Sequence, residues 1–254
     1  MIELVSDLQR RLDAKAQPAK RRWWEQYLKG EAAFRGVPMD DVRKAVDSWV
    51  RDYGLLAHQD QILLRLLARM VEQPMTEDKL AAALLLEEHL VPADRIPFSK
   101  ALAAAGGYFE EAHLADWNVV DWFCVKALWA LVERDGEACA RQILSWSSEA
   151  NLWRARASVV TFANASARGR GLFDQFPEAL VTACGDLIIR RERFAKTGVG
   201  WVLRGLRESE PALVDGFVET HAEHFSLEAL KSVVRGAPPE HQRSVVARWK
   251  ASQH

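Results

Sequence analysis

Apolar residues recur at intervals of three and four along almost the whole chain, as in the segments DQILLRLLARMVEQ (60–73) and EDKLAAALLLEEHLV (77–91). This spacing gives an α-helix one apolar face, and the alternation typical of β-strands is absent from the sequence. Short breaks with Pro or Gly, such as GVPM, EQPM and GAPP, separate the helical segments. The pattern predicts an all-α protein without an obvious linker, so we assign residues 1–254 to one domain.

Helix pairs repeat along the second half of the chain. Residues 136–162, 177–203 and 211–234 each read as a helix, a short connector and a second helix. Their spacing falls in the range of roughly 33 to 47 residues found in tandem helix-pair repeats, which stack into superhelical solenoids with a concave binding face. We therefore predict a solenoid of helix-pair repeats, with an irregular helical bundle as the alternative.

Composition excludes several classes of protein. No apolar run reaches the roughly 18 residues of a membrane span. The N-terminal stretch MIELVSDLQRRLDAKA reads as an amphipathic helix rather than a secretory signal, so we expect a cytoplasmic protein. Cys124, Cys139 and Cys184 lie far apart in apolar helical runs, which predicts core residues rather than disulfides. The histidines lack metal-ligand spacing, and we expect neither a metal nor another cofactor.

The distribution of charge is more informative than the net charge of −1, which argues mildly against a protein dedicated to nucleic acid. Basic residues nevertheless gather in clusters that would suit a polyanionic partner, with solvated helix faces as the ordinary explanation for any one of them. The clusters are KRR (20–22), WRAR (153–156), ARGRG (167–171, with Arg168 and Arg170) and RRERFAK (190–196).

One carboxylate stands in an apolar helix. Trp117 and Asp121 are four residues apart in ADWNVVDWFCVKALWALV, and therefore on the same helical face. An unpaired buried carboxylate costs several kcal/mol, so Asp121 needs a partner, such as Lys126 or an arginine of the next repeat, or a chemical purpose. Trp122, Trp129 and Trp146 lie on apolar stripes, and we interpret them as core residues.

Similar pairs of Trp and Arg follow in the next helices, namely Trp153 with Arg156 and Trp201 with Arg204. Gly198 and Gly200 come just before the latter pair in TGVGWVLRGL. Each glycine costs about 1 kcal/mol relative to Ala inside a helix. We interpret that cost as a sign that something must approach this backbone closely.

In this order, these residues resemble the AlkD family of bacterial DNA alkylation-repair glycosylases, all-helical proteins built from HEAT-like repeats. The segment QYLKGEAAFRGVPMDDVRKAV, with Tyr27 and Lys29, is similar to the N-terminal signature of that family. DWNVVDW is similar to its catalytic helix, NLWRARASVV to the next repeat, and VGWVLRGL to the segment with a second active-site Trp. The ordered set is specific, although no single motif is.

The sequence departs from the family pattern in two places. Asn118 follows Trp117, where the family often has a second Trp. An insertion-like stretch around residues 163–175 separates the helix of Arg156 from the next repeat. It would either extend a DNA-binding track with its arginines or form a longer loop, and both alternatives stay open.

The resemblance implies a glycosylase that removes cationic N-alkylated purines from duplex DNA by hydrolysis, while the base stays stacked. Asp121 would stabilise the positive charge that develops on the deoxyribose and position the attacking water. Trp117 and Trp201 would offer indole faces to the cationic nucleotide. The implied partner is double-stranded DNA with alkylated bases, bound by a monomer away from any membrane. The implied DNA contacts are Arg156, Trp153, Tyr27, Arg154, Arg204, Arg190 and Lys29.

A non-catalytic HEAT-repeat scaffold that binds damaged or branched DNA, or a protein partner, is the alternative. Asp121 separates the two hypotheses, because a carboxylate that faces DNA weakens binding by repulsion. That cost makes sense only with catalysis. A lyase that works through a Schiff base would need a lysine beside the carboxylate. Lys126 stands five residues past Asp121 and off its face, so we expect a monofunctional enzyme.

Overall fold

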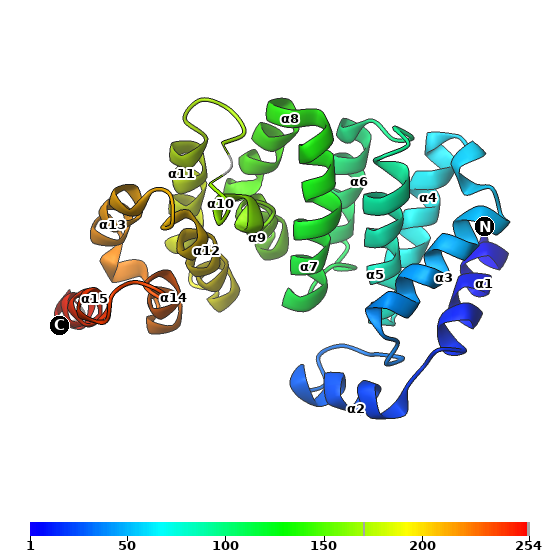
Figure 1. Ribbon diagram of the computed structural model, residues 1–254, viewed down its shortest axis with the longest axis horizontal. Helices are drawn as coiled ribbons and strands as arrows, with labels where there is room; N and C mark the ends of the chain where they lie inside the picture. Colours follow the sequence, from blue (N-terminus) through cyan, green and yellow to red (C-terminus); the bar gives the residue numbers. More distant parts are fainter. Residues whose placement is uncertain (170, 253–254) are drawn as a thin grey trace. The chain divides into compact units, whose positions relative to one another are not determined.

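The computed structural model describes residues 1–169 and 171–252, and most of them are helical (Figure 1). Within these residues the only β-type pairing is an isolated bridge between Ala33 and Met75. The all-α prediction is confirmed. No helix of the described chain is long and apolar enough to cross a membrane. Arg170 of the ARGRG cluster lies outside the described residues.

The chain divides into two compact units, Met1–Asp135 and Gly136–His254. The boundary falls inside α8, where Gly136 leaves helical geometry with φ 65° and ψ −141°. The assignment of residues 1–254 to one domain stays a prediction. The first unit contains α1 (Ile2–Asp13), α2 (Pro18–Tyr27), α3 (Met39–Asp52), η1 (Leu55–Ala57), α4 (Asp60–Val71), α5 (Thr76–Leu84), η2 (Leu85–Leu90), α6 (Phe98–Glu110), α7 (Trp117–Phe123), η3 (Cys124–Leu128) and the first part of α8 (Trp129–Leu144).

In the first unit, α1, α3, α4, α5, α6 and α7 pack side by side, with α5 against α3, α4 and α7. Two segments are π-helical, η2 after α5 and η3 after α7, and they contact each other. The helix α2 has no buried residue and lies apart from the other helices of this unit in Figure 1. Its residues are exposed or half-buried.

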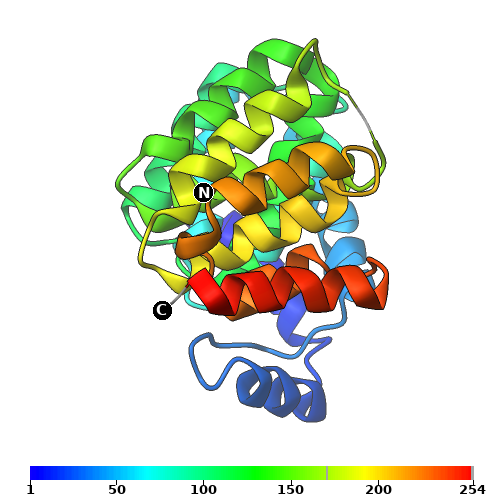
Figure 2. The same ribbon diagram turned by 90° about the vertical axis from the view of Figure 1, so that its left-hand side faces the viewer.

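The second unit contains the three helix pairs that the sequence predicts. Its elements after α8 are η4 (Ser145–Ser148), α9 (Leu152–Val160), α10 (Ala163–Ser166), α11 (Phe176–Ile188), α12 (Arg193–Leu206), α13 (Pro211–Thr220), η5 (Ala222–His224), α14 (Leu227–Val233) and α15 (Pro239–Ser252). α12 is the central helix, because it contacts α9, α10, α11, α13 and α14. α15, red in Figure 2, packs against α14 and η5.

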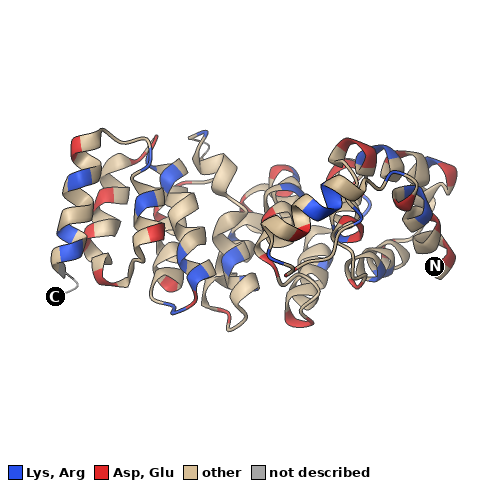
Figure 3. Cartoon of the chain, turned by 90° about the horizontal axis from the view of Figure 1, so that it is seen from below, with Lys and Arg blue, Asp and Glu red and all other residues tan. Residues whose placement is uncertain are grey.

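Apolar side chains fill both units. Cys124, Cys139 and Cys184 are all buried, as predicted. Trp129 and Trp146 are buried too, which confirms them as core residues, whereas Trp122 is half-buried. Figure 3 shows that Lys and Arg alternate with Asp and Glu along the chain, and that basic segments recur on the helices near the C-terminus.

Candidate active site

Asp116 determines where the helix of Trp117 and Asp121 begins. Its backbone is extended, with φ −129° and ψ 150°, and its Oδ1 accepts a hydrogen bond of 2.9 Å from the backbone N–H of Val119. This is N-capping by a carboxylate. Burial is the largest influence on Asp116 and raises the pKa of its carboxyl group, and the negative charge of Asp121 raises that pKa further.

Trp117 and Asp121 are both half-buried on α7. The ring of Tyr27 meets Trp117 edge to face, with centroids 5.9 Å apart and planes at 67°. Trp23 lies one turn before Tyr27 on α2 and stacks on it at 5.2 Å and 6°. Trp23 and Tyr27 are each 55% exposed. The structure thus forms an open aromatic cluster, in which Trp23 and Tyr27 of α2 meet Trp117 of α7, and Trp117 shares its helix face with Asp121.

Trp23 is not among the residues predicted above. The signal for it is its spacing of four residues from Tyr27, which places two aromatic rings on one face of a helix. A pair of exposed aromatic side chains is unusual on a protein surface and marks a surface with a partner. Lys29, which follows the helix, is exposed and has a positive φ of 54°.

The loop between α2 and α3 fixes the position of α2. Glu77 is buried, and its carboxylate accepts hydrogen bonds from the backbone N–H groups of Arg35 (2.9 Å), Gly36 (2.7 Å) and Val37 (3.1 Å). Gly36 has φ 83°, and a Cβ there would come within 2.5 Å of backbone atoms at the start of α2. This loop therefore needs glycine at position 36 and an acceptor at position 77.

Neighbouring side chains complete the surroundings of α7. Trp24 stacks on Phe34 at 5.5 Å and 12°, beside a cavity of about 170 Å³ that Asn118 and Trp122 also line. Asn118, which follows Trp117, is buried. Lys126 forms an ion pair of 3.1 Å with Glu87 and lies 5.9 Å from the ring centroid of Trp122, which gives it a structural role.

In the second unit, Arg156 is buried, with 4% of its surface exposed. Its Nη1 donates to the carbonyl oxygen of Phe194 and to Thr197 Oγ1 (3.3 Å). A Cβ at Gly198 would come within 2.9 Å of the same Nη1. Arg156 therefore packs through the space that Gly198 leaves open, and it holds α9 against α12.

Other groups of the protein approach Gly198 and Gly200 closely, as the sequence predicts. A Cβ at Gly200 would lie 2.7 Å from the carbonyl oxygen of Ala229 and 3.0 Å from its Cα, both in α14. Close approach is the reason for both glycines, and the approaching groups are Arg156 and the backbone of α14. Helix packing within the unit accounts for their cost.

Two other residues of this unit that the sequence predicts as DNA contacts, Trp153 and Arg154, lie at the start of α9. Asn151 caps α9, and its Oδ1 accepts from the N–H groups of Trp153 (2.9 Å) and Arg154 (3.0 Å). Trp153 packs on Phe194 at 5.2 Å. Arg154 pairs with Glu149 at 3.3 Å, so this group braces the connector before α9.

Arg190 supports the same connector, because its guanidinium donates to the carbonyl oxygens of Glu149 (2.8 Å) and Ala150 (2.9 Å). Trp201 and Arg204, three residues apart on α12, are half-buried. Arg168, in the loop after α10, is exposed. In the stretch around residues 163–175, α10 covers Ala163–Ser166, and the described residues after it, 167–169 and 171–175, are not helical.

The comparisons with known proteins agree with this fold. A family model described as DNA alkylation repair enzyme matches residues 8–234. A predicted DNA alkylation repair enzyme from Enterococcus faecalis has 15% sequence identity and a TM-score of 0.73, with 89% of this chain and 98% of that chain covered. AlkD2 from Streptococcus mutans has 16% identity and a TM-score of 0.57, with 78% and 90% covered. These similarities confirm the predicted helical-repeat fold. No curated protein matches the chain in sequence.

Proposed function

Because the chain belongs to the DNA alkylation repair enzyme family, we propose that it is a monofunctional DNA glycosylase that removes cationic N-alkylated purines from duplex DNA. Examples of such bases are 7-methylguanine and 3-methyladenine. The observation that supports this proposal is the half-buried carboxylate of Asp121 on the same helix face as Trp117, beside the open rings of Tyr27 and Trp23.

The reaction that fits this site is hydrolysis of the N-glycosidic bond. Alkylation of a ring nitrogen gives the purine a positive charge. When the bond between the sugar C1′ and the base nitrogen breaks, the bonding electron pair goes to the base, which leaves neutral. The positive charge moves to the deoxyribose, where the carboxylate of Asp121 stabilises it. Water then attacks C1′ and gives up a proton.

The aromatic residues suit a cationic nucleotide that remains in the duplex. An indole ring attracts a cation with about 0.5 to 2 kcal/mol, depending on solvent exposure. We propose this role for Trp117, and Trp201 is the second candidate for it that the family resemblance implies. A site of exposed rings needs no deep pocket for an extruded base, so excision without base flipping is part of the proposal. Bulky adducts would be tolerated for the same reason.

The predicted DNA contacts receive different roles. Arg204, Lys29 and Tyr27 are the candidates for direct contact with the lesion-bearing strand, because each is half-buried or exposed. The guanidinium groups of Arg156, Arg154 and Arg190 bond to carbonyl or carboxylate oxygens of the protein itself. We propose that these three, together with Trp153, position the helices that face DNA. The concave DNA-binding face stays a prediction.

The proposal is tested by release of 7-methylguanine from a defined methylated duplex. We expect the wild-type protein to release the base and Asp121→Asn to lose at least about two orders of magnitude in rate, the loss typical of one electrostatic contact in a transition state. Asp41→Asn removes a partly exposed carboxylate from α3 and serves as the matched control. Binding of methylated duplex without release by the wild type would favour the non-catalytic scaffold.

A further inference from the structure

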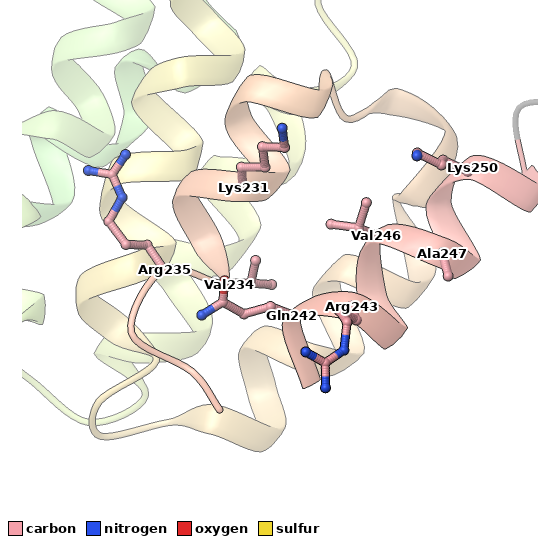
Figure 4. A pocket seen from close by; sticks show the side chains of 8 residues that line it. All are labelled: Lys231, Val234, Arg235, Gln242, Arg243, Val246, Ala247 and Lys250. Atoms are coloured by element: carbon pink, nitrogen blue, oxygen red, sulfur yellow. The ribbon is translucent and has the colours of Figure 1, made fainter. Parts of the chain in front are cut away.

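A groove of about 550 Å³ lies between α14 and α15 in the second unit. Val234 and Val246 are at its middle, and four cationic residues surround it, as Figure 4 shows. These four residues are Lys231, Arg235, Arg243 and Lys250. The groove thus combines an apolar floor with a rim of positive charge.

The charge of the groove is not neutralised by its surroundings. Among residues 1–169 and 171–252, none of the four cations forms an ion pair. Two nearby carboxylates have partners elsewhere, because Glu228 pairs with Arg193 at 2.7 Å and Glu219 with Arg248 at 3.1 Å. Glu240, three residues before Arg243 on α15, is exposed and forms no ion pair with the four cations in the described part of the chain. Four like charges around one groove repel each other, and an anionic ligand would remove that cost.

The spacing of the cations suits a linear polyanion. Arg243 and Lys250 are seven residues apart on α15, which places them on one face and about 10.5 Å apart along the helix axis. That distance corresponds to about three base steps of duplex DNA, in which phosphates on one strand recur every 3.4 Å along the axis. Lys231 and Arg235 face them from α14 and the turn after it.

The residues that line the groove point to phosphates rather than bases. The eight lining residues of the described chain include no aromatic side chain, so the groove offers no platform on which an unpaired base would stack. Most of them, from Arg235 onward, also follow the segment that the family model matches, which ends at residue 234. The groove is thus a feature that family membership does not assign.

We propose that this groove binds the sugar–phosphate backbone of duplex DNA, without regard to a lesion, as a second contact that keeps the protein on DNA. The inference rests on the proposed function, since that function supplies DNA as the partner. Phosphate contacts position a protein on a duplex but carry no sequence information. A lesion-independent contact of this kind supports a search along undamaged DNA.

The test is binding of an undamaged, fluorescently labelled duplex by the full chain at several salt concentrations. Each phosphate contact contributes about 0.9 to the slope of log K against log salt. We expect the variant Arg243→Ala/Lys250→Ala to lower that slope by about 1.8 and to weaken binding about 60-fold near 0.1 M salt. Arg248→Ala removes a cation from the same helix but outside the groove, and we expect it to leave the slope unchanged.

A charge-conserving variant, Arg243→Lys/Lys250→Arg, separates the loss of contacts from a fault in folding. We expect it to keep the salt slope of the wild type. An unchanged salt slope of DNA binding in the double alanine variant would overturn the inference. This holds even if that variant loses affinity for vesicles of phosphatidylglycerol, an anionic surface other than DNA. The readout needs no catalysis. Wild-type binding that depends on the groove, without release of 7-methylguanine, would refute only the proposed glycosylase.

Discussion

The guanidinium of Arg156 occupies the space beside Gly198, where any Cβ would come within 2.9 Å of its Nη1. The two residues belong to α9 and α12, 42 positions apart in the sequence. A buried arginine is stable only when its donors have acceptors, and here the carbonyl oxygen of Phe194 is one of them. The pair therefore joins α9 and α12, because the side chain of Arg156 is hydrogen-bonded in α12 and fills the space left by the missing side chain of Gly198.

The glycines of the second unit should respond differently to alanine. Gly200→Ala meets the backbone of Ala229, and overpacking of about 1–3 kcal/mol should outweigh the helix propensity gained. Gly198→Ala should lower the free energy of unfolding by less, because its Cβ meets the end of the Arg156 side chain rather than backbone. Gly216→Ala on α13, which meets nothing within 4 Å, should stabilise by up to about 1 kcal/mol. Thermal unfolding of the three variants checks this order, and equal shifts would contradict it.

Glu77→Ala should loosen α2 and the loop after it. Three backbone N–H groups would lose a carboxylate acceptor, and we expect unfolding to become easier by about 2–4 kcal/mol. Glu72→Ala is the control, because it removes only a surface ion pair with Arg69, worth at most about 1 kcal/mol. Urea unfolding measures the difference. Faster cleavage of Glu77→Ala between α2 and α3 in limited proteolysis would show that the loosened segment is this loop. Similar losses of unfolding free energy in both variants would refute the role of Glu77.

Asp116→Asn should change the dependence of stability on pH. Burial raises the pKa of Asp116 above its ordinary value of 3.8. Its contribution to stability is thus fully present below pH 3.8 and is lost as the pH rises through the raised pKa. Asn keeps the helix cap without the charge. The melting temperature of the variant minus that of the wild type should therefore be higher at pH 7.5 than at pH 3.5. A difference that is the same at both pH values would exclude this effect.

Tyr27→Ala should weaken excision through Trp117. An edge-to-face contact between aromatic rings is worth about 0.5–1.5 kcal/mol, so we expect kcat/KM for 7-methylguanine release to fall about 2- to 10-fold. Tyr27→Phe keeps the ring and should retain the activity of the wild type. A loss in both variants would assign the effect to the phenolic hydroxyl instead.

Much of the fold follows from local pattern, whereas the contacts of the candidate site do not. Apolar periodicity and Pro or Gly breaks predict the helices, because both act within a few residues. The cost of Gly198 and Gly200 was also evident, but its cause depends on Arg156 and Ala229, which lie in other helices. Sequence spacing likewise identified Arg156 without indicating that it is buried. The roles of Asp121, Trp117 and Trp201 stay predictions.

The π-helical segment after α7 coincides with a four-residue spacing of buried residues in the sequence. Buried pairs recur every four residues there, at 119–120, 123–124, 127–128 and 131–132, and Asn118 and Trp129 beside them are buried too. A regular α-helix with 3.6 residues per turn would rotate such pairs by about 40° at each turn, and the wider π-turns of η3 absorb that rotation. Removal of one residue between 124 and 128 would turn Trp117 and Asp121 by about 100° relative to α8. In this helix, the number of residues therefore governs the direction of the carboxylate as strictly as their identity governs the core.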